Sequence, residues 1–143
     1  MANHKSTDRE SGTQLMPKFD AKGLVTAIVS ETGSGKPLMV AHMNEAALEL
    51  SISSGEAHFF SRSRNEIWHK GGTSGNVLRI DDMLVDCDQD AVWLSVTPQG
   101  HGAACHTGQK SCFFRRIVTN DGVVTLQPTG EAPLFDPKNV YGS

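Results

Sequence analysis

The 143-residue chain has little cysteine, no long apolar run and no excess of basic charge. Its three cysteines are an odd number, which argues against a disulfide framework and leaves metal binding, catalysis or burial as their roles. No segment reaches the roughly 20 apolar residues of a membrane helix, and the N-terminus lacks the apolar core of a signal peptide. A net charge of −3 offers no basic surface to a nucleic-acid backbone. We therefore expect a cytoplasmic protein that binds neither nucleic acid nor membrane.

The length predicts one domain with a real core, because two domains of ordinary size would need a longer chain. Residues 1–17 are rich in Ser, Thr and charged residues and have almost nothing to bury, so we expect a disordered leader. The domain itself is expected over residues 18–127. Residues 128–143 have the composition of a C-terminal tail.

The pattern of apolar runs and turn residues predicts an α+β fold. Apolar runs at 23–29 and 37–42 flank a glycine-rich turn, which is typical of a β-hairpin. Asn44 is suited to cap a helix over 45–54, and Gly55 stands where a left-handed C-terminal residue is needed. Further strands are expected over 57–62, 66–69, 76–80, 83–85, 91–96, 111–118 and 123–126, with a loop over 99–109. The sequence therefore predicts a mostly antiparallel sheet with one main helix.

Each cysteine lies among other polar or ligand-type side chains. Cys87 stands between aspartates, Cys105 opens a Cys-His-Thr-Gly segment, and Cys112 follows a Lys-Ser pair. Three thiolates leave the fourth position of a tetrahedral zinc open, as a catalytic zinc requires. The alternative for a cysteine in a reducing compartment is burial as a small hydrophobic residue.

An acidic triplet, Asp86, Asp88 and Asp90, surrounds Cys87 at alternating positions. If this segment is extended, the three carboxylates project to one face and the thiol to the other. Carboxylate oxygens suit Mg²⁺ and sulfur suits Zn²⁺, so the pleat alone could separate two metal sites. The alternative is a solvated acidic turn before a strand.

A second polar cluster combines cations with hydroxyl groups and glycines, which is a composition that binds phosphate. Its members are Arg62, Arg64, Lys70, Thr73 and Ser74. The alternative is a surface hairpin with scattered charges.

Taken together, these segments closely resemble the phosphoribosyl-AMP cyclohydrolase family of histidine biosynthesis. The resemblance covers about residues 23–117, in order and with matching spacing. The segments that carry it are Gly55–Arg64, Trp68–Gly71, Thr73–Asn76, Asp86–Asp90, Ala104–Gly108 and Ser111–Phe113.

The resemblance implies a compact α+β homodimer that uses zinc and magnesium. It implies that Cys87, Cys105 and Cys112 hold a zinc ion at the dimer interface, and that Asp86, Asp88 and Asp90 hold magnesium. The implied reaction is hydrolysis of the N1–C6 bond of the adenine ring of 1-(5-phosphoribosyl)-AMP, which gives the formimino-aminoimidazole carboxamide ribonucleotide. In the family this is the third step of histidine biosynthesis.

Ring opening needs a proton acceptor and a proton donor, and imidazole titrates in the right range. His106, beside a ligand cysteine, and His69 are equal candidates. Arg62, Arg64 and Lys70 are the expected contacts of the two substrate phosphates, with Thr73 and Ser74 in support.

Two alternatives stay open from the sequence. A zinc-dependent purine-ring hydrolase or deaminase would also attack C6, and a deaminase would expel ammonia. A non-enzymatic zinc module would use His106 to close a Cys₃His site, and its folded state would depend on zinc.

Overall fold

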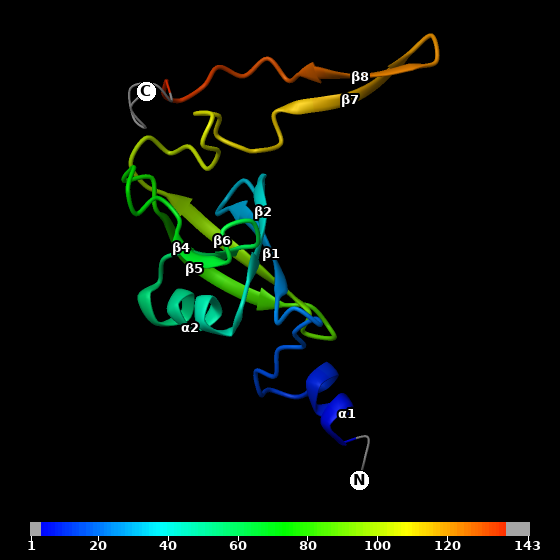
Figure 1. Cartoon of the computed structure of the whole chain (residues 1–143), viewed down its shortest axis with the longest axis vertical. Helices are drawn as coiled ribbons and strands as arrows, with labels where there is room; N and C mark the ends of the chain where they lie inside the picture. Colours follow the sequence, from blue (N-terminus) through cyan, green and yellow to red (C-terminus); the bar gives the residue numbers. More distant parts are fainter. Residues whose placement is uncertain (1–3, 137–143) are drawn as a thin grey trace.

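The computed structural model describes residues 4–136 of the chain, with side chains from residue 8 onward. Figure 1 shows the course of the chain. The elements are α1 (His4–Ser11), β1 (Val25–Glu31), β2 (Pro37–Met43), α2 (Glu45–Ser54), β3 (His58–Ser61), β4 (Glu66–His69), β5 (Leu78–Val85), β6 (Ala91–Pro98), β7 (Arg115–Asn120) and β8 (Val123–Pro128).

A four-stranded sheet in the order β2-β1-β6-β5 carries the core. Alternate residues of its strands, such as Val29 on β1 and Leu94 on β6, are fully buried on one face. Ala47 and Leu48 of α2 belong to the same buried cluster, so α2 covers this face of the sheet. The expected α+β class and mostly antiparallel pairing are confirmed, although β1 and β6 form a parallel pair.

Helix α2 begins and ends as its flanking residues predict. The side chain of Asn44 accepts a hydrogen bond of 2.8 Å from Ala47 N at the first turn. Gly55 has a φ of 75° and donates its N–H to Ser51 O, which closes the helix.

Two strand predictions need correction. The expected strands 76–80 and 83–85 are one strand, β5, with an irregularity between Ile80 and Asp82. The expected strand over 111–118 begins only at Arg115, because Cys112 N donates to Leu38 O at 2.7 Å and holds the preceding segment against the beginning of β2.

Helix α1 is a second helix that the sequence did not predict, and it lies within the expected disordered leader. The side chain of Gln89 links the leader to the domain, since Nε2 donates to Arg9 O and Oε1 accepts from Met16 N. The limits of leader, domain and tail stay predictions, and residues 137–143 of the tail lie outside the described chain. Neither helix within residues 4–136 is long and apolar enough to cross a membrane.

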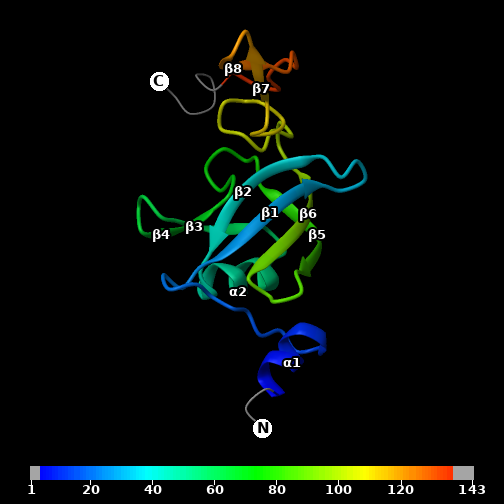
Figure 2. The same ribbon diagram turned by 90° about the vertical axis from the view of Figure 1, so that its right-hand side faces the viewer.

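Two small hairpins complete the fold. β3 and β4 pair with each other, and β3 also packs against β2 and α2. β7 and β8 pair with each other and project away from the body, as the two perpendicular views show (Figures 1 and 2).

Candidate active site

Cys105 and Cys112 lie together in the irregular chain that follows β6. Cys105 is buried, and its Sγ accepts a hydrogen bond of 3.0 Å from Thr107 Oγ1. Cys112 is held by the bond from its N–H to Leu38 O. The ammonium of buried Lys70 is close enough to both cysteines to interact with them. We call Cys105, Cys112 and Lys70 the thiol cluster.

The electrostatics of the thiol cluster fit a metal ion. Burial raises the pKa of the Cys112 thiol to about 12, and the neighbouring Cys105 adds to the rise, while the Lys70 ammonium opposes it. Burial also lowers the pKa of Lys70, against the effect of the two cysteines. Cys105 is buried and Cys112 is exposed beside it. A cation would stabilise two adjacent thiolates, and zinc is a cation that prefers sulfur.

The two predicted proton carriers differ in their surroundings. His69 Nε2 lies 2.7 Å from Glu56 Oε1, and its ring stacks on His58 at a centroid distance of 4.5 Å. His106 is exposed and directly follows Cys105. Glu56 was not predicted as a functional residue, although an acidic residue just before the strand that pairs with His69 is a signal that the sequence contains.

The predicted phosphate contacts Thr73 and Ser74 lie in the loop that follows Lys70. This loop closes on Asn76, whose N–H donates to Ser74 Oγ at 3.2 Å. Asn76 is buried, its Oδ1 accepts from His101 N at 2.8 Å, and its Nδ2 has no hydrogen-bond partner among the described residues. Asn76 belongs to a segment that carries the family resemblance, but no role was predicted for it.

The acidic triplet lies in a tight turn between β5 and β6, so of the two conformations considered from the sequence the structure has the acidic turn and not the extended segment. Asp86 accepts hydrogen bonds from the N–H groups of Asp90 and Ala91, and Gln89 adopts a left-handed φ of 57°. The turn nevertheless brings oxygens of Asp86, Asp88 and Asp90 within 4.8 Å of one another. Among the side chains described, those of residues 8–136, no other set of three His, Cys, Asp or Glu ligand atoms is this close.

The crowding of the three carboxylates fits a divalent cation. Side-chain hydrogen bonds with Asp86, the larger effect, and with Asp88 raise the pKa of Asp90 to about 6. The hydrogen bond with Asp90 in turn lowers the pKa of Asp88. A hard cation such as Mg²⁺ would relieve this repulsion.

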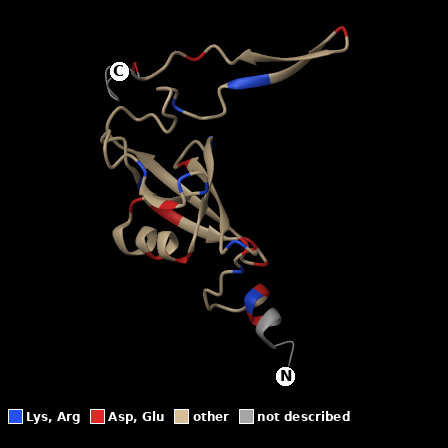
Figure 3. Ribbon diagram, viewed as in Figure 1, with Lys and Arg blue, Asp and Glu red and all other residues tan. Residues whose placement is uncertain are grey.

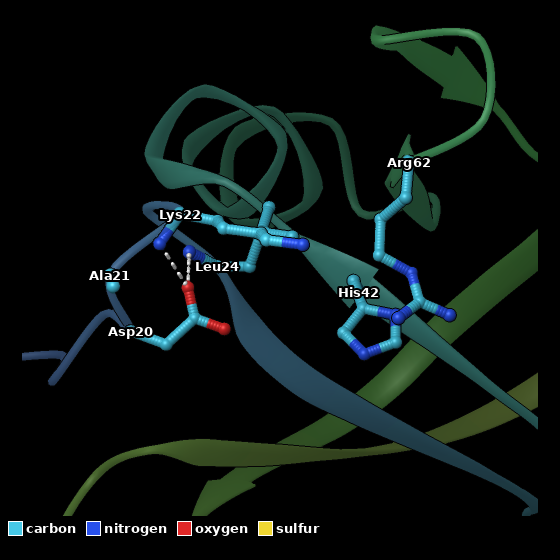
Figure 4. A pocket seen from close by; sticks show the side chains of 6 residues that line it. All are labelled: Asp20, Ala21, Lys22, Leu24, His42 and Arg62. Carbon is cyan, nitrogen blue, oxygen red and sulfur yellow. Dashed lines mark hydrogen bonds between the residues drawn. The ribbon is translucent and has the colours of Figure 1, made fainter.

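Arg62 lines a shallow pocket of about 260 Å³ between β2 and the chain before β1 (Figure 4). The guanidinium points toward the ring of His42, and burial together with this charge lowers the pKa of His42. Asp20 lines the same pocket and accepts from two backbone N–H groups. Arg64 is exposed in the turn between β3 and β4.

The predicted site residues fall at two opposite ends of the sheet. Cys87 precedes the eight-residue strand β6 and Cys105 follows it, so about 25 Å of strand lies between them at ~3.3 Å per residue. Cys112 is bonded to Leu38, which lies beside the far ends of β1 and β6. The three cysteines of one chain therefore do not meet. For the same reason they do not form a closed site with His106 within one chain.

We call the end that holds the acidic triplet the carboxylate end. Arg62 belongs to it, because His42 pairs with Thr26, and Thr26 N donates to Asp90 O. The thiol cluster occupies the other end of the sheet, together with the loop of Thr73 and Ser74.

Comparison with known proteins gives a consistent result. The family model described as phosphoribosyl-AMP cyclohydrolase matches residues 39–114, which include every predicted metal ligand. The curated phosphoribosyl-AMP cyclohydrolase of Rhizobium leguminosarum bv. trifolii (strain WSM2304) is 52% identical over 133 residues, covering 93% of this chain and 89% of the relative. That of Rhodopseudomonas palustris (strain BisB18) is 55% identical over 135 residues, covering 94% and 91%.

Proposed function

Because the chain belongs to the phosphoribosyl-AMP cyclohydrolase family, we propose that it opens the adenine ring of 1-(5-phosphoribosyl)-AMP in histidine biosynthesis. Water adds at C6, the N1–C6 bond breaks, and the product is the formimino-aminoimidazole carboxamide ribonucleotide. The relatives named for this activity align with the chain over 89% and 91% of their own length. The residues expected to act lie within the matched segment.

The observation that carries the arrangement of the site is the separation of its residues between two ends of one sheet. We infer a homodimer in which Cys87 of one subunit completes a zinc site with Cys105 and Cys112 of the other. A two-fold axis makes such a contact twice, because the carboxylate end of each subunit meets the thiol cluster of its partner. Each dimer then holds two complete sites.

The donor sets indicate which metal belongs to which end. The thiolates of Cys87, Cys105 and Cys112 would hold zinc, and the oxygens of the acidic triplet would hold magnesium. Zinc with three protein ligands would act as a Lewis acid. It would lower the pKa of its bound water, so that hydroxide is available at neutral pH.

The histidines of the thiol-cluster end are suited to move protons. Ring opening requires that a base accept a proton from water and that an acid deliver one to N1. Glu56 fixes the orientation of the His69 ring through the 2.7 Å contact with Nε2. His106 is placed by its neighbour Cys105, so both histidines act from the subunit that supplies two of the thiols.

The substrate carries two phosphates far apart, and the dimer offers phosphate-binding groups from both subunits. Arg62 and Arg64 of the carboxylate end would bind one phosphate. Thr73 and Ser74, in the loop after Lys70, would bind the other with hydroxyl and backbone N–H groups. The buried ammonium of Lys70 lies beside the thiols, where it offsets negative charge.

The test is an absorbance assay of ring opening with purified protein, combined with zinc analysis and an ammonia assay. We expect ring opening that depends on zinc and on added magnesium, without release of ammonia. Ammonia release would identify a deaminase instead. A zinc-dependent fold without turnover would identify a zinc-binding module.

A further inference from the structure

The face of the four-stranded sheet opposite α2, which we call the outer face, carries a row of exposed apolar side chains. Val40, Ile28, Trp93 and Leu84 lie opposite one another in register across β2, β1, β6 and β5. Each is between 42% and 50% exposed, and a hollow of about 240 Å³ runs along the last three. Contiguous apolar surface of this kind marks an interaction site.

The β7–β8 hairpin carries a second apolar surface and has little contact with the body. Ile117, Val124 and Leu126 project from one of its faces and are 75%, 64% and 53% exposed. Neither strand makes substantial contact with another helix or strand of the described chain. An isolated two-stranded hairpin is marginally stable in water, so this one needs a surface to cover it.

We propose that the β7–β8 hairpin of one subunit packs across the outer face of the sheet of a second copy of the chain. The face with Ile117, Val124 and Leu126 lies against the apolar row of the partner. This arrangement rests on the proposed function, because the shared zinc site decides which ends of the two subunits meet.

The positions of the proposed zinc ligands would bring the hairpin of one subunit close to the apolar row of the other. β7 begins three residues after Cys112, and Leu84 stands three residues before Cys87. If both cysteines bind one zinc ion through Zn–S bonds of ~2.3 Å, the Sγ of Cys112 would lie within about 4 Å of the Sγ of the partner's Cys87. The hairpin of one subunit therefore starts beside the apolar row of the other.

Shape and charge favour the same contact. In Figure 1 α2 lies on one side of the sheet and the hairpin extends toward the other side, and in Figure 2 the strands of the sheet lie in front of α2. Arg115 and Arg116 make the beginning of the hairpin basic (Figure 3). Asp82 shares the face of Leu84, so the edge of the row carries negative charge.

The first test compares two double variants of the full chain by sedimentation. Ile117→Asp with Leu126→Asp places two carboxylates on the docking face, and we expect the dissociation constant of the dimer to rise about a hundredfold, roughly tenfold for each buried charge. The control, Thr125→Asp with Gln127→Asp, adds the same charge to the opposite, exposed face and should change the constant by less than about twofold. Circular dichroism verifies that both variants keep the fold.

The second test locates the contact directly. A photoreactive benzoylphenylalanine replaces Leu126, and the substituted chain is exchanged with isotopically heavy chain. Cross-links to heavy peptides that contain Ile28 or Trp93 support the docking. Cross-links confined to the same chain, or equal dimerisation of the two double variants, would overturn it.

The two proposals fail separately. Ring opening at a shared zinc site without the cross-link would refute the hairpin docking alone. The cross-link without ring opening would refute the proposed function and leave the docking in place.

Discussion

Two cysteines and the buried ammonium of Lys70 lie together at one end of the sheet, and this arrangement supports the metal site proposed there. Desolvation and the neighbouring Cys105 raise the pKa of Cys112 to about 12, and a bound cation would favour its thiolate form. Thr107 donates to Cys105 Sγ and thereby orients the sulfur. These contacts support the proposal that Cys105 and Cys112 are a pair of metal ligands.

We predict that Cys105→Ser and Cys112→Ser each lose bound zinc and reduce turnover at least about a hundredfold, since a ligand is removed outright. The fold should persist, because neither side chain belongs to the main hydrophobic core. Zinc analysis, circular dichroism and the ring-opening assay measure the three effects. Thr107→Ser, which keeps the hydroxyl, is the control, and full zinc with normal turnover in either cysteine variant would remove the ligand assignment.

The acidic triplet gives a second prediction at the residue scale. Asp88→Asn should weaken the magnesium dependence of turnover by about tenfold or more while zinc stays bound, because the amide offers the hard cation a poorer ligand. Asp121→Asn, in the exposed turn between β7 and β8, is the matched control. Loss of zinc together with an unchanged magnesium titration would show that the two sites are not separate.

Elements whose signals are local were predicted from the sequence, and elements that depend on distant contacts were not. α2 was predicted because Asn44 and Gly55 lie directly at its ends. α1 was missed because its connection to the domain runs through Gln89, far along the chain. The strand expected at Cys112 was misplaced for the same reason, since the bond to Leu38 is tertiary.

The loop after Lys70 gives a prediction at the scale of an element. Gly71 has a φ of 80°, and a Cβ there would lie 2.2 Å from the carbonyl carbon of Asn76. Gly71→Ala should therefore destabilise the protein by about 3 kcal/mol or more and displace Thr73 and Ser74, which raises KM. Gly75→Ala also has a positive φ but meets no atom within 4 Å, so it should cost only about 1–2 kcal/mol.

Chemical denaturation and substrate titration measure the two effects. Equal stability and equal KM in the two glycine variants would contradict the role of this close approach.

At the scale of the whole molecule, the resemblance implied a zinc site between two subunits, and the structure adds how far apart the predicted ligands lie within one chain. Cys87 and Cys105 are 18 positions apart, with a predicted strand and loop between them, and the structure shows that strand β6 spans the sheet and leaves the two cysteines at opposite ends. The sequence left open whether the acidic segment is extended or a turn, and the structure has the turn, with Gln89 in the left-handed region. The carboxylates converge all the same, which is why the residue types alone indicated the metal.

The central claim is that two subunits share each zinc site, and subunit mixing tests it most directly. A chain with Cys87→Ala and a chain with Cys105→Ala are each inactive, and a heterodimer of the two has one intact site and one doubly broken site. Random reassortment of equal amounts should restore about a quarter of wild-type ring opening, since half of the dimers are mixed and half of their sites are intact. A mixture that stays inactive after verified subunit exchange would contradict the shared site.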